Sequence, residues 1–180
     1  MSNITLRTTK GSPLTHEELD NNFNACLGIH NLLHVEDRKP TRIHGGTFTS
    51  GAWRTRDLNT IIINNIPGSS LDNNQITLPV GQYWVEGSVP ARGVDAHKAR
   101  LRQVSPNSIT LLNATTESTT GATAVSTKSV ISGFIDIEQT SIVELQHINN
   151  TTATDWGFGA GMLSETSEIN IFSQIKIWKI

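Results

Sequence analysis

From residue 42 to residue 180 apolar and polar residues alternate with a period of two, and this pattern constrains the fold more than any other feature. The C-terminal residues give the clearest case. Ile175 and Ile177 fall on one side of a strand, whereas Lys176 and Trp178 fall on the other. Short segments of this kind, separated by turn residues, predict a jelly roll or a related β-sandwich.

Ten segments are expected to be strands, and two segments rich in Thr, Ser and Asn are expected to be loops. The expected strands are 43–48, 52–56, 60–64, 75–78, 82–89, 97–104, 109–112, 125–137, 142–148 and 169–180. The expected loops are 113–128 and 149–155.

A helix-start signal precedes the alternating region. Gly11 and Pro13 mark a turn. Thr15 and Glu18 have the spacing of a capping box, in which each side chain accepts a hydrogen bond from the backbone N–H of the other residue. We therefore expect a helix over residues 15–33, with Thr15 and Glu18 as its cap.

The expected helix carries five residues spaced four, three, four and three apart, as in a short coiled coil. These stem residues are Leu19, Phe23, Cys26, His30 and Leu33. A helix containing three Asn residues and a Gly is weak alone, which favours assembly with other copies. The alternative is one amphipathic helix packed against its own domain. In a trimer, the three copies of His30 would face the threefold axis. They would form a polar layer of the stem or surround a bound ion.

The expected fold class is mainly β, with a short N-terminal α-helical stem, a trimeric coiled coil, followed by a jelly-roll β-sandwich head. The expected parts are a docking arm at 1–14, a helical trimerisation stem at 15–34, a linker at 35–41 and the head at 42–180.

Charge and cysteine content limit the possible partners. The formal net charge is -2 and the pI is about 6.3, so no electrostatic attraction to nucleic acid or anionic membrane is expected. The single cysteine, Cys26, excludes an intrachain disulfide. No apolar stretch has the length of a membrane span, and the first residues lack the apolar core of a signal peptide. Synthesis in a cytoplasm is therefore expected.

No catalytic motif stands out, so the chain is not expected to be an enzyme or to hold a cofactor. No pair of histidines has the spacing of a zinc-protease motif, and no metal site is expected. The glycine-rich segment 157–162 lacks the spacing of a dinucleotide-binding loop. Some carboxylates of the head leave a carbohydrate-active enzyme as an alternative. They are Asp57, Glu86, Asp95, Asp136, Glu138, Glu144 and Asp155.

A set of polar and aromatic residues in the head is a candidate for contact with a receptor or ligand. Trp156 follows a polar loop, and an exposed Trp can stack on a sugar or anchor a protein, although a structural role is the alternative. The candidate contact residues are Arg92, Asp95, His97, Asp155 and Trp156.

The segment TLRTTKGSPLTHEELDNNFN, residues 5–24, resembles the N-terminal module of tailed-phage tail-fibre and other virion proteins. Residues 78–102, 144–150 and 156–180 resemble the jelly-roll heads at the C-termini of phage fibres. Those heads are similar in form to the trimeric heads of complement and tumour necrosis factor.

The resemblance implies a homotrimeric virion protein of tail-fibre type that attaches the particle to its host. The alternative is a capsid decoration, head fibre, baseplate or neck component without receptor binding, because almost no shaft separates module and head. Implied partners are other virion proteins, reached through the N-terminal arm, and a host surface glycan or protein. Nucleic-acid binding and membrane insertion are not implied. The expected location is the virion, after synthesis in the host cytoplasm.

Overall fold

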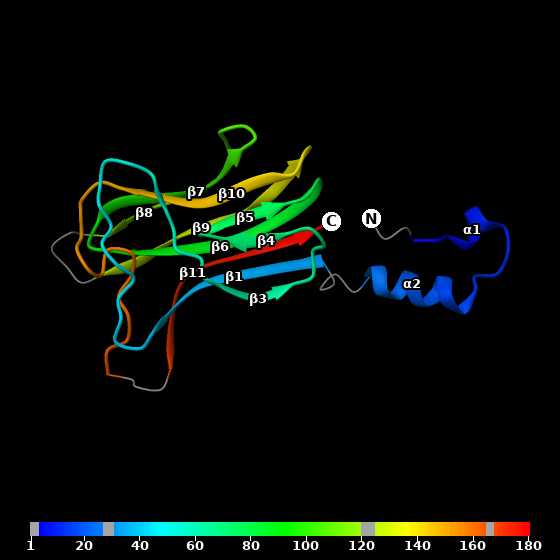
Figure 1. Cartoon of the computed structure of the whole chain (residues 1–180), viewed down its shortest axis with the longest axis horizontal. Coiled ribbons are helices and arrows are strands. Elements are labelled where there is room, and N and C mark those ends of the chain that lie inside the picture. Colours follow the sequence, from blue (N-terminus) through cyan, green and yellow to red (C-terminus); the bar gives the residue numbers. More distant parts are fainter. Residues whose placement is uncertain (1–3, 27–30, 120–124, 165–167) are drawn as a thin grey trace.

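The computed structural model describes residues 4–26, 31–119, 125–164 and 168–180. Two short helices precede eleven strands (Figure 1). The helices are α1 (Arg7–Lys10) and α2 (His16–Cys26). The strands are β1 (Leu32–Pro40), β2 (Arg54–Thr55), β3 (Thr60–Asn64), β4 (Ser70–Asp72), β5 (Gln75–Leu78), β6 (Gly81–Arg92), β7 (Asp95–Ser105), β8 (Ile109–Thr119), β9 (Ser126–Ile137), β10 (Ser141–Asn149) and β11 (Ile169–Lys179).

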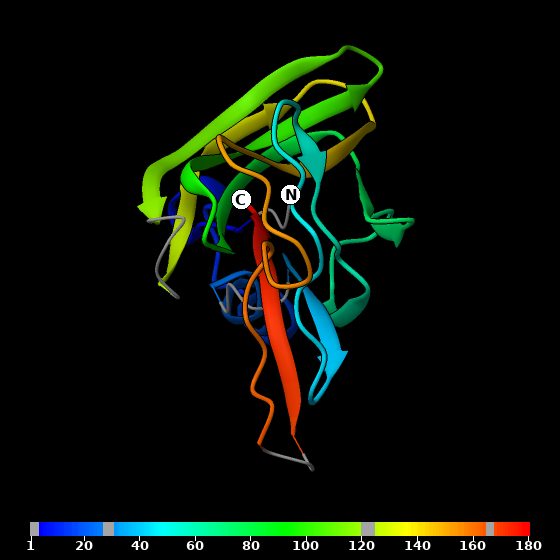
Figure 2. The same ribbon diagram turned by 90° about the vertical axis from the view of Figure 1, so that its left-hand side faces the viewer.

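The strands form two antiparallel sheets that pack face to face (Figure 2). The five-stranded sheet has the order β3-β1-β11-β6-β9, so the C-terminal strand β11 lies at its centre. The second sheet has the order β4-β5-β10-β7-β8, with β2 also paired to β10. Several neighbours in these sheets are far apart in sequence, such as β1 and β11 or β5 and β10, as in a jelly roll. The predicted mainly β, jelly-roll fold class is therefore confirmed.

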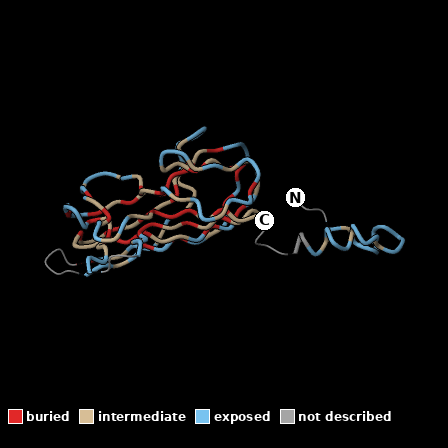
Figure 3. Tube along the Cα trace, turned by 60° about the horizontal axis from the view of Figure 1, so that its bottom comes forward, coloured by how far each residue is buried: buried red, intermediate tan, exposed pale blue. Residues whose placement is uncertain are grey.

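The core lies between the sheets, where buried positions concentrate (Figure 3). Alternate residues of β6 and β11, Tyr83, Val85, Ile175 and Ile177, are completely buried, as the period of two predicts. The same holds for Leu101 on β7 in the opposite sheet. By contrast, no described residue before residue 24 is buried.

Strand β1 occupies residues that were expected to end the helix and form a linker. Helix α2 ends at Cys26, so the prediction of a helix to residue 33 and of a linker at 35–41 was wrong. Leu33 and Val35 have no exposed surface and fill the core. Leu33 is consequently not a stem residue. The spacing between Leu33 and Phe23 fits a coiled-coil heptad, whereas the spacing between Leu33 and Val35 fits a strand. The strand forms because β1 pairs with both β3 and β11.

Two further local predictions differ from the structure. The expected loop at 113–128 is mostly strand, because β8 continues to Thr119 and β9 begins at Ser126, and Thr favours strands. The expected strand at 43–48 is irregular and contributes a single bridge between Phe48 and Ala153. None of the helices in the described part of the chain is both long and apolar enough to cross a bilayer.

Candidate functional site

The first candidate site is the outer face of the five-stranded sheet, which is turned away from the second sheet. Trp84 on β6 is 40 % exposed although its neighbours Tyr83 and Val85 are buried. Likewise Phe134 on β9 is 49 % exposed beside the buried Ile135. Strand alternation thus places large aromatic side chains on the solvent side of the sheet.

These aromatic side chains form one row across the outer face. The strand register sets Trp84 opposite Trp178 on β11 and opposite Phe134 on β9. Leu32 on β1 continues the row beyond Trp178. A contiguous apolar row on a solvent-exposed sheet is typical of a surface that another molecule covers.

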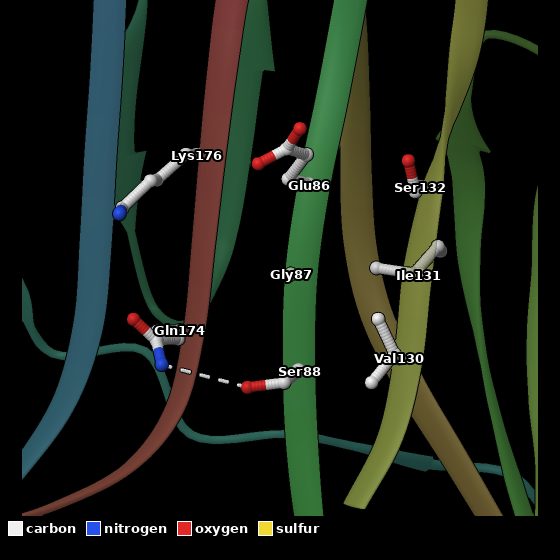
Figure 4. Close-up of a pocket in the computed structure, with 8 residues that line it drawn as sticks. All are labelled: Glu86, Gly87, Ser88, Val130, Ile131, Ser132, Gln174 and Lys176. Atoms are coloured by element: carbon white, nitrogen blue, oxygen red, sulfur yellow. Dashed lines mark hydrogen bonds between the residues drawn. The ribbon is translucent and has the colours of Figure 1, made fainter.

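The next row along the strands is polar and carries both signs of charge. Lys176 lies opposite Glu86, and Glu86 lies opposite Ser132. Figure 4 shows these side chains around a hollow of about 380 Å³, where Gly87 contributes only backbone to the lining. The outer face therefore combines an apolar row with a charged hollow beside it.

Strand β1, which lies between β3 and β11, adds an ion-pair cluster to the same face. Glu36 is 5 % exposed and accepts a hydrogen bond of 2.7 Å from Arg38 Nε. Its other oxygen lies 3.0 Å from His34 Nε2. Burial lowers the pKa of His34 although Glu36 opposes this shift. His34 is thus a neutral imidazole at neutral pH, and the cluster contributes a buried carboxylate held by Arg38.

Helix α2 is the second candidate surface, and it begins with the expected cap. Glu18 N donates to Thr15 Oγ1 at 3.2 Å, and Thr15 N donates to Glu18 Oε2 at 2.7 Å. Lys10 forms an ion pair with Glu18 and, as the largest cause, lowers the pKa of that carboxyl group. Asn22 exchanges two hydrogen bonds with the backbone of Thr5, so the arm folds back along the helix.

Two of the predicted stem residues, Leu19 and Phe23, are exposed. Leu19 and Phe23 lie one turn apart on α2, with 39 % and 67 % of their surface exposed. Cys26 is the last residue of the helix. His30 lies outside the described residues. An exposed Phe next to an exposed Leu gives α2 an apolar stripe without a partner among the described residues.

A loop cluster is the third candidate site, and it unites three of the predicted contact residues. Arg92 at the end of β6 places its guanidinium carbon 5.6 Å from the centre of the Trp156 ring. His44 meets the same ring edge-on at 6.1 Å between centroids, and its Nε2 lies 3.8 Å from Asp155 Oδ2. The sequence did not single out His44, because it lies far from Trp156 along the chain.

The other two predicted contact residues, Asp95 and His97, make different contacts. His97 is 2 % exposed and shares hydrogen bonds with His147 at 2.9 Å and with Thr127 at 2.8 Å. Burial lowers the pKa of His97 to about 4 and that of His147 to about 2. Asp95 forms a hydrogen bond with Thr151. His97 is therefore a core residue, and a ligand at Trp156 would not reach it.

Behind the loop cluster lies a buried arginine that no sequence pattern indicated. Arg56 is 1 % exposed, and its guanidinium lies 4.1 Å from the centre of the Phe158 ring. Its Nε donates to Ser173 Oγ at 2.8 Å, and its Nη2 donates to the Phe158 carbonyl at 2.9 Å. Burial lowers its pKa to about 9, which leaves it charged at neutral pH. Arg56 thus ties the loop that follows β10 to β11.

Comparison with solved structures places the head in a known fold. One structure of murine APRIL, at pH 5.0, superposes with a TM-score of 0.57 at 9 % identity, covering 83 % of this chain and 98 % of that one. A second, at pH 8.5, gives a TM-score of 0.55 at 10 % identity with the same coverage. At this identity the likeness concerns the fold alone: the head is a tumour-necrosis-factor-like jelly roll.

No family model matches the sequence, and no curated protein matches it either. Among the described residues, no three His, Cys, Asp or Glu side chains gather where they could share a metal ion. The candidate sites are therefore the sheet face, the helix stripe and the loop cluster, all of which suit binding to other molecules.

Proposed function

We propose that the chain is a homotrimeric, non-enzymatic virion protein of tail-fibre type, in which three heads pack through the outer faces of their five-stranded sheets. The observation that carries this proposal is the aromatic row of Trp178, Trp84 and Phe134, in which Trp84 and Phe134 are exposed and Trp178 is half-buried. Aromatic side chains bury about 150–250 Å² each, so covering the row removes a large apolar area from water. The charged pair Glu86 and Lys176 beside it sets orientation between copies.

A second copy is the occupant that the charges favour. The outer face carries Lys176 and Arg38 as well as Glu86, so it offers both signs of charge to an identical surface. The fold likeness to murine APRIL supports the same arrangement, because the phage-fibre heads that the sequence resembles are similar in form to the trimeric heads of tumour necrosis factor. Helix α2, with Leu19 and Phe23 exposed, supplies a second contact between copies.

Attachment to a host is the proposed role of the assembled trimer, and it follows from the likeness of residues 5–24 to phage virion modules. The N-terminal arm would hold the trimer on another virion protein. The competing role is a capsid, baseplate or neck component without receptor binding. This competing role is favoured by the short stretch of sequence between α2 and the head. Helix α2 ends at Cys26, and the first strand of the head, β1, begins at Leu32.

Two measurements test this function. Fluorescently labelled protein should adsorb to cells of a susceptible strain from a panel of bacteria, and antibody labelling should place the chain at the tail of the particle. Adsorption to no strain, with labelling on the capsid or neck, would favour the competing structural role. Labelling of no part of the particle would overturn the proposal.

A further inference from the structure

We propose that Trp156, with Arg92, His44 and Asp155, forms a carbohydrate-binding site that takes a hexopyranose unit of a host surface glycan. This inference rests on the proposed attachment function and names the chemical class of the receptor. It also changes the predicted set of contact residues, because His44 joins the site and His97 is buried in the core.

The side chain of Trp156 offers an aromatic surface surrounded by polar groups. It is 44 % exposed, and the ring contacts described above come from Arg92 and His44. A pyranose has a face of C–H groups that packs on an aromatic ring and hydroxyl groups around its rim that need donors and acceptors. Tryptophan anchors of protein interfaces instead lie in desolvated, well-packed pockets. The polar surroundings of Trp156 therefore favour a sugar.

The groups at the rim supply both kinds of hydrogen-bonding partner. The Asp155 side chain is 69 % exposed, and its carboxylate can accept hydrogen bonds from two neighbouring hydroxyls. The Arg92 guanidinium donates several N–H groups in a fixed plane. Together they can hold adjacent hydroxyls of one sugar ring that rests on Trp156.

The loop that carries Trp156 is fixed before any ligand arrives. Gly46 N donates to Asp155 O at 2.8 Å, and Asp155 N donates to Thr47 Oγ1 at 3.0 Å. Arg92 N donates to the Gly157 carbonyl at 3.1 Å. A Cβ on Gly157 would lie 2.5 Å from the Ala153 carbonyl oxygen, so the loop packs too closely for any other residue there. Such preorganisation reduces the entropy lost on binding.

The position of the loop on the head suits contact with a cell surface. The segments around residues 41–53 and 150–160 lie at the end of the sandwich opposite α2 (Figure 1). If the N-terminal arm holds the virion, this end faces outward. Three copies in one trimer would bind a repetitive glycan with an avidity above that of a single weak site.

The test is binding of the full-length protein to a microarray of bacterial surface polysaccharides. Wild type should bind at least one polysaccharide, and Trp156→Ala should reduce that signal at least about tenfold, whereas Trp156→Phe should retain part of it. Asp155→Asn should also reduce binding, and Asn tolerates the left-handed backbone at this position, where φ is 64°. The matched control is Trp53→Ala, since Arg100 stacks on the Trp53 ring at 3.9 Å, whereas Arg92 and His44 contact the ring of Trp156.

The proposal is overturned if wild type binds no polysaccharide, if Trp156→Ala binds like wild type, or if Trp53→Ala loses binding equally. It is also overturned if Trp156→Ala keeps its fold but dissociates the assembly, because Trp156 would then be an interface residue. If Trp156→Ala fails to fold, the test depends on Asp155→Asn, and unchanged polysaccharide binding by that variant overturns the proposal. Adsorption to cells that persists in a folded Trp156→Ala trimer would refute the sugar site but leave the attachment function standing.

Discussion

Trp84 on β6 lies directly opposite Trp178 on β11, on the side of the five-stranded sheet that faces away from the core. Directly opposed residues in an antiparallel pair have Cβ atoms about 5 Å apart, so the two indoles form one continuous apolar surface. Phe134 extends this surface on the next strand. Their arrangement is the main reason to expect that the head is covered by further copies of itself.

Replacing Trp84 by Glu should dissociate the assembly while leaving the head folded. Trp84 is 40 % exposed in the protomer, so a polar side chain is tolerated there. An interface tryptophan is worth about 2 kcal/mol or more, which corresponds to at least a thirtyfold weaker association. Size-exclusion chromatography with light scattering over a dilution series measures this shift.

The matched control is Thr116→Glu, which places the same charge at an exposed position of β8 in the other sheet. It should leave the mass unchanged. If Trp84→Glu and Thr116→Glu dissociate equally, the added negative charge explains the dissociation and the loss of the aromatic row does not. If neither does, the outer face is not the contact surface.

Replacing Phe23 by Asp should weaken association through the stem. The side chain of Phe23 is 67 % exposed in the protomer, so this change should hardly affect the free energy of unfolding. Covering a Phe is worth about 2 kcal/mol, so loss of a contact between copies should weaken association by more than tenfold per contact. Asn21→Asp adds the same charge at another exposed position of α2 and is the control. An unchanged dissociation midpoint for Phe23→Asp would show that α2 makes no such contact.

Replacing Arg56 by Ala should lower the free energy of unfolding by about 3 kcal/mol, because it leaves a cavity and removes the donors to Ser173 and Phe158. Urea denaturation followed by tryptophan fluorescence measures the loss. Arg54→Ala, two residues away and exposed, should stay within about 0.5 kcal/mol of wild type. A loss below about 1 kcal/mol for Arg56→Ala would mean that the buried guanidinium is not structural.

Stability should fall as the pH is lowered from about 6.5 to about 4. The folded-state pKa values of His97 and His147, about 4 and about 2, lie below the value of about 6.5 for an unfolded histidine. In this range the unfolded chain binds protons that the folded chain does not, so acid favours unfolding by up to about 1.4 kcal/mol per pH unit for each histidine.

Urea midpoints at pH 7 and pH 4.5 measure this dependence. Other groups also titrate, so the informative quantity is the difference between wild type and a variant with His97 and His147 both replaced by Gln. The double variant should lose less stability on acidification than wild type. Equal losses in the two proteins would exclude the histidine pair as the cause.

The period of two predicted the sandwich because each strand has one face in the core. Val85, Ile175 and Ile177 follow the alternation and are fully buried. The pattern could not show which helical residues belong to the stem. Leu33 fits both a heptad and a strand, and only pairing of β1 with β11 decides between them.

The loop cluster was predicted only in part, for a physical reason. Asp155 and Trp156 are adjacent in sequence and follow a polar segment, so they could be singled out together. Arg92 was also a predicted contact residue, but the contacts of Arg92 and His44 with the Trp156 ring arise through folding of distant segments, which local patterns do not encode. The prediction of His97 as a contact residue was wrong. His97 shares one side of β7 with Ala99 and Leu101, and that side faces the core.

The most direct test of the central claim is the mass of the wild-type protein in solution, measured by sedimentation equilibrium at micromolar concentration. Association of three chains through their sheet faces predicts a single species with three times the chain mass of 19.7 kDa. A species at 19.7 kDa throughout the concentration range would contradict the claim, since the row of Trp178, Trp84 and Phe134 would then be stable in contact with water.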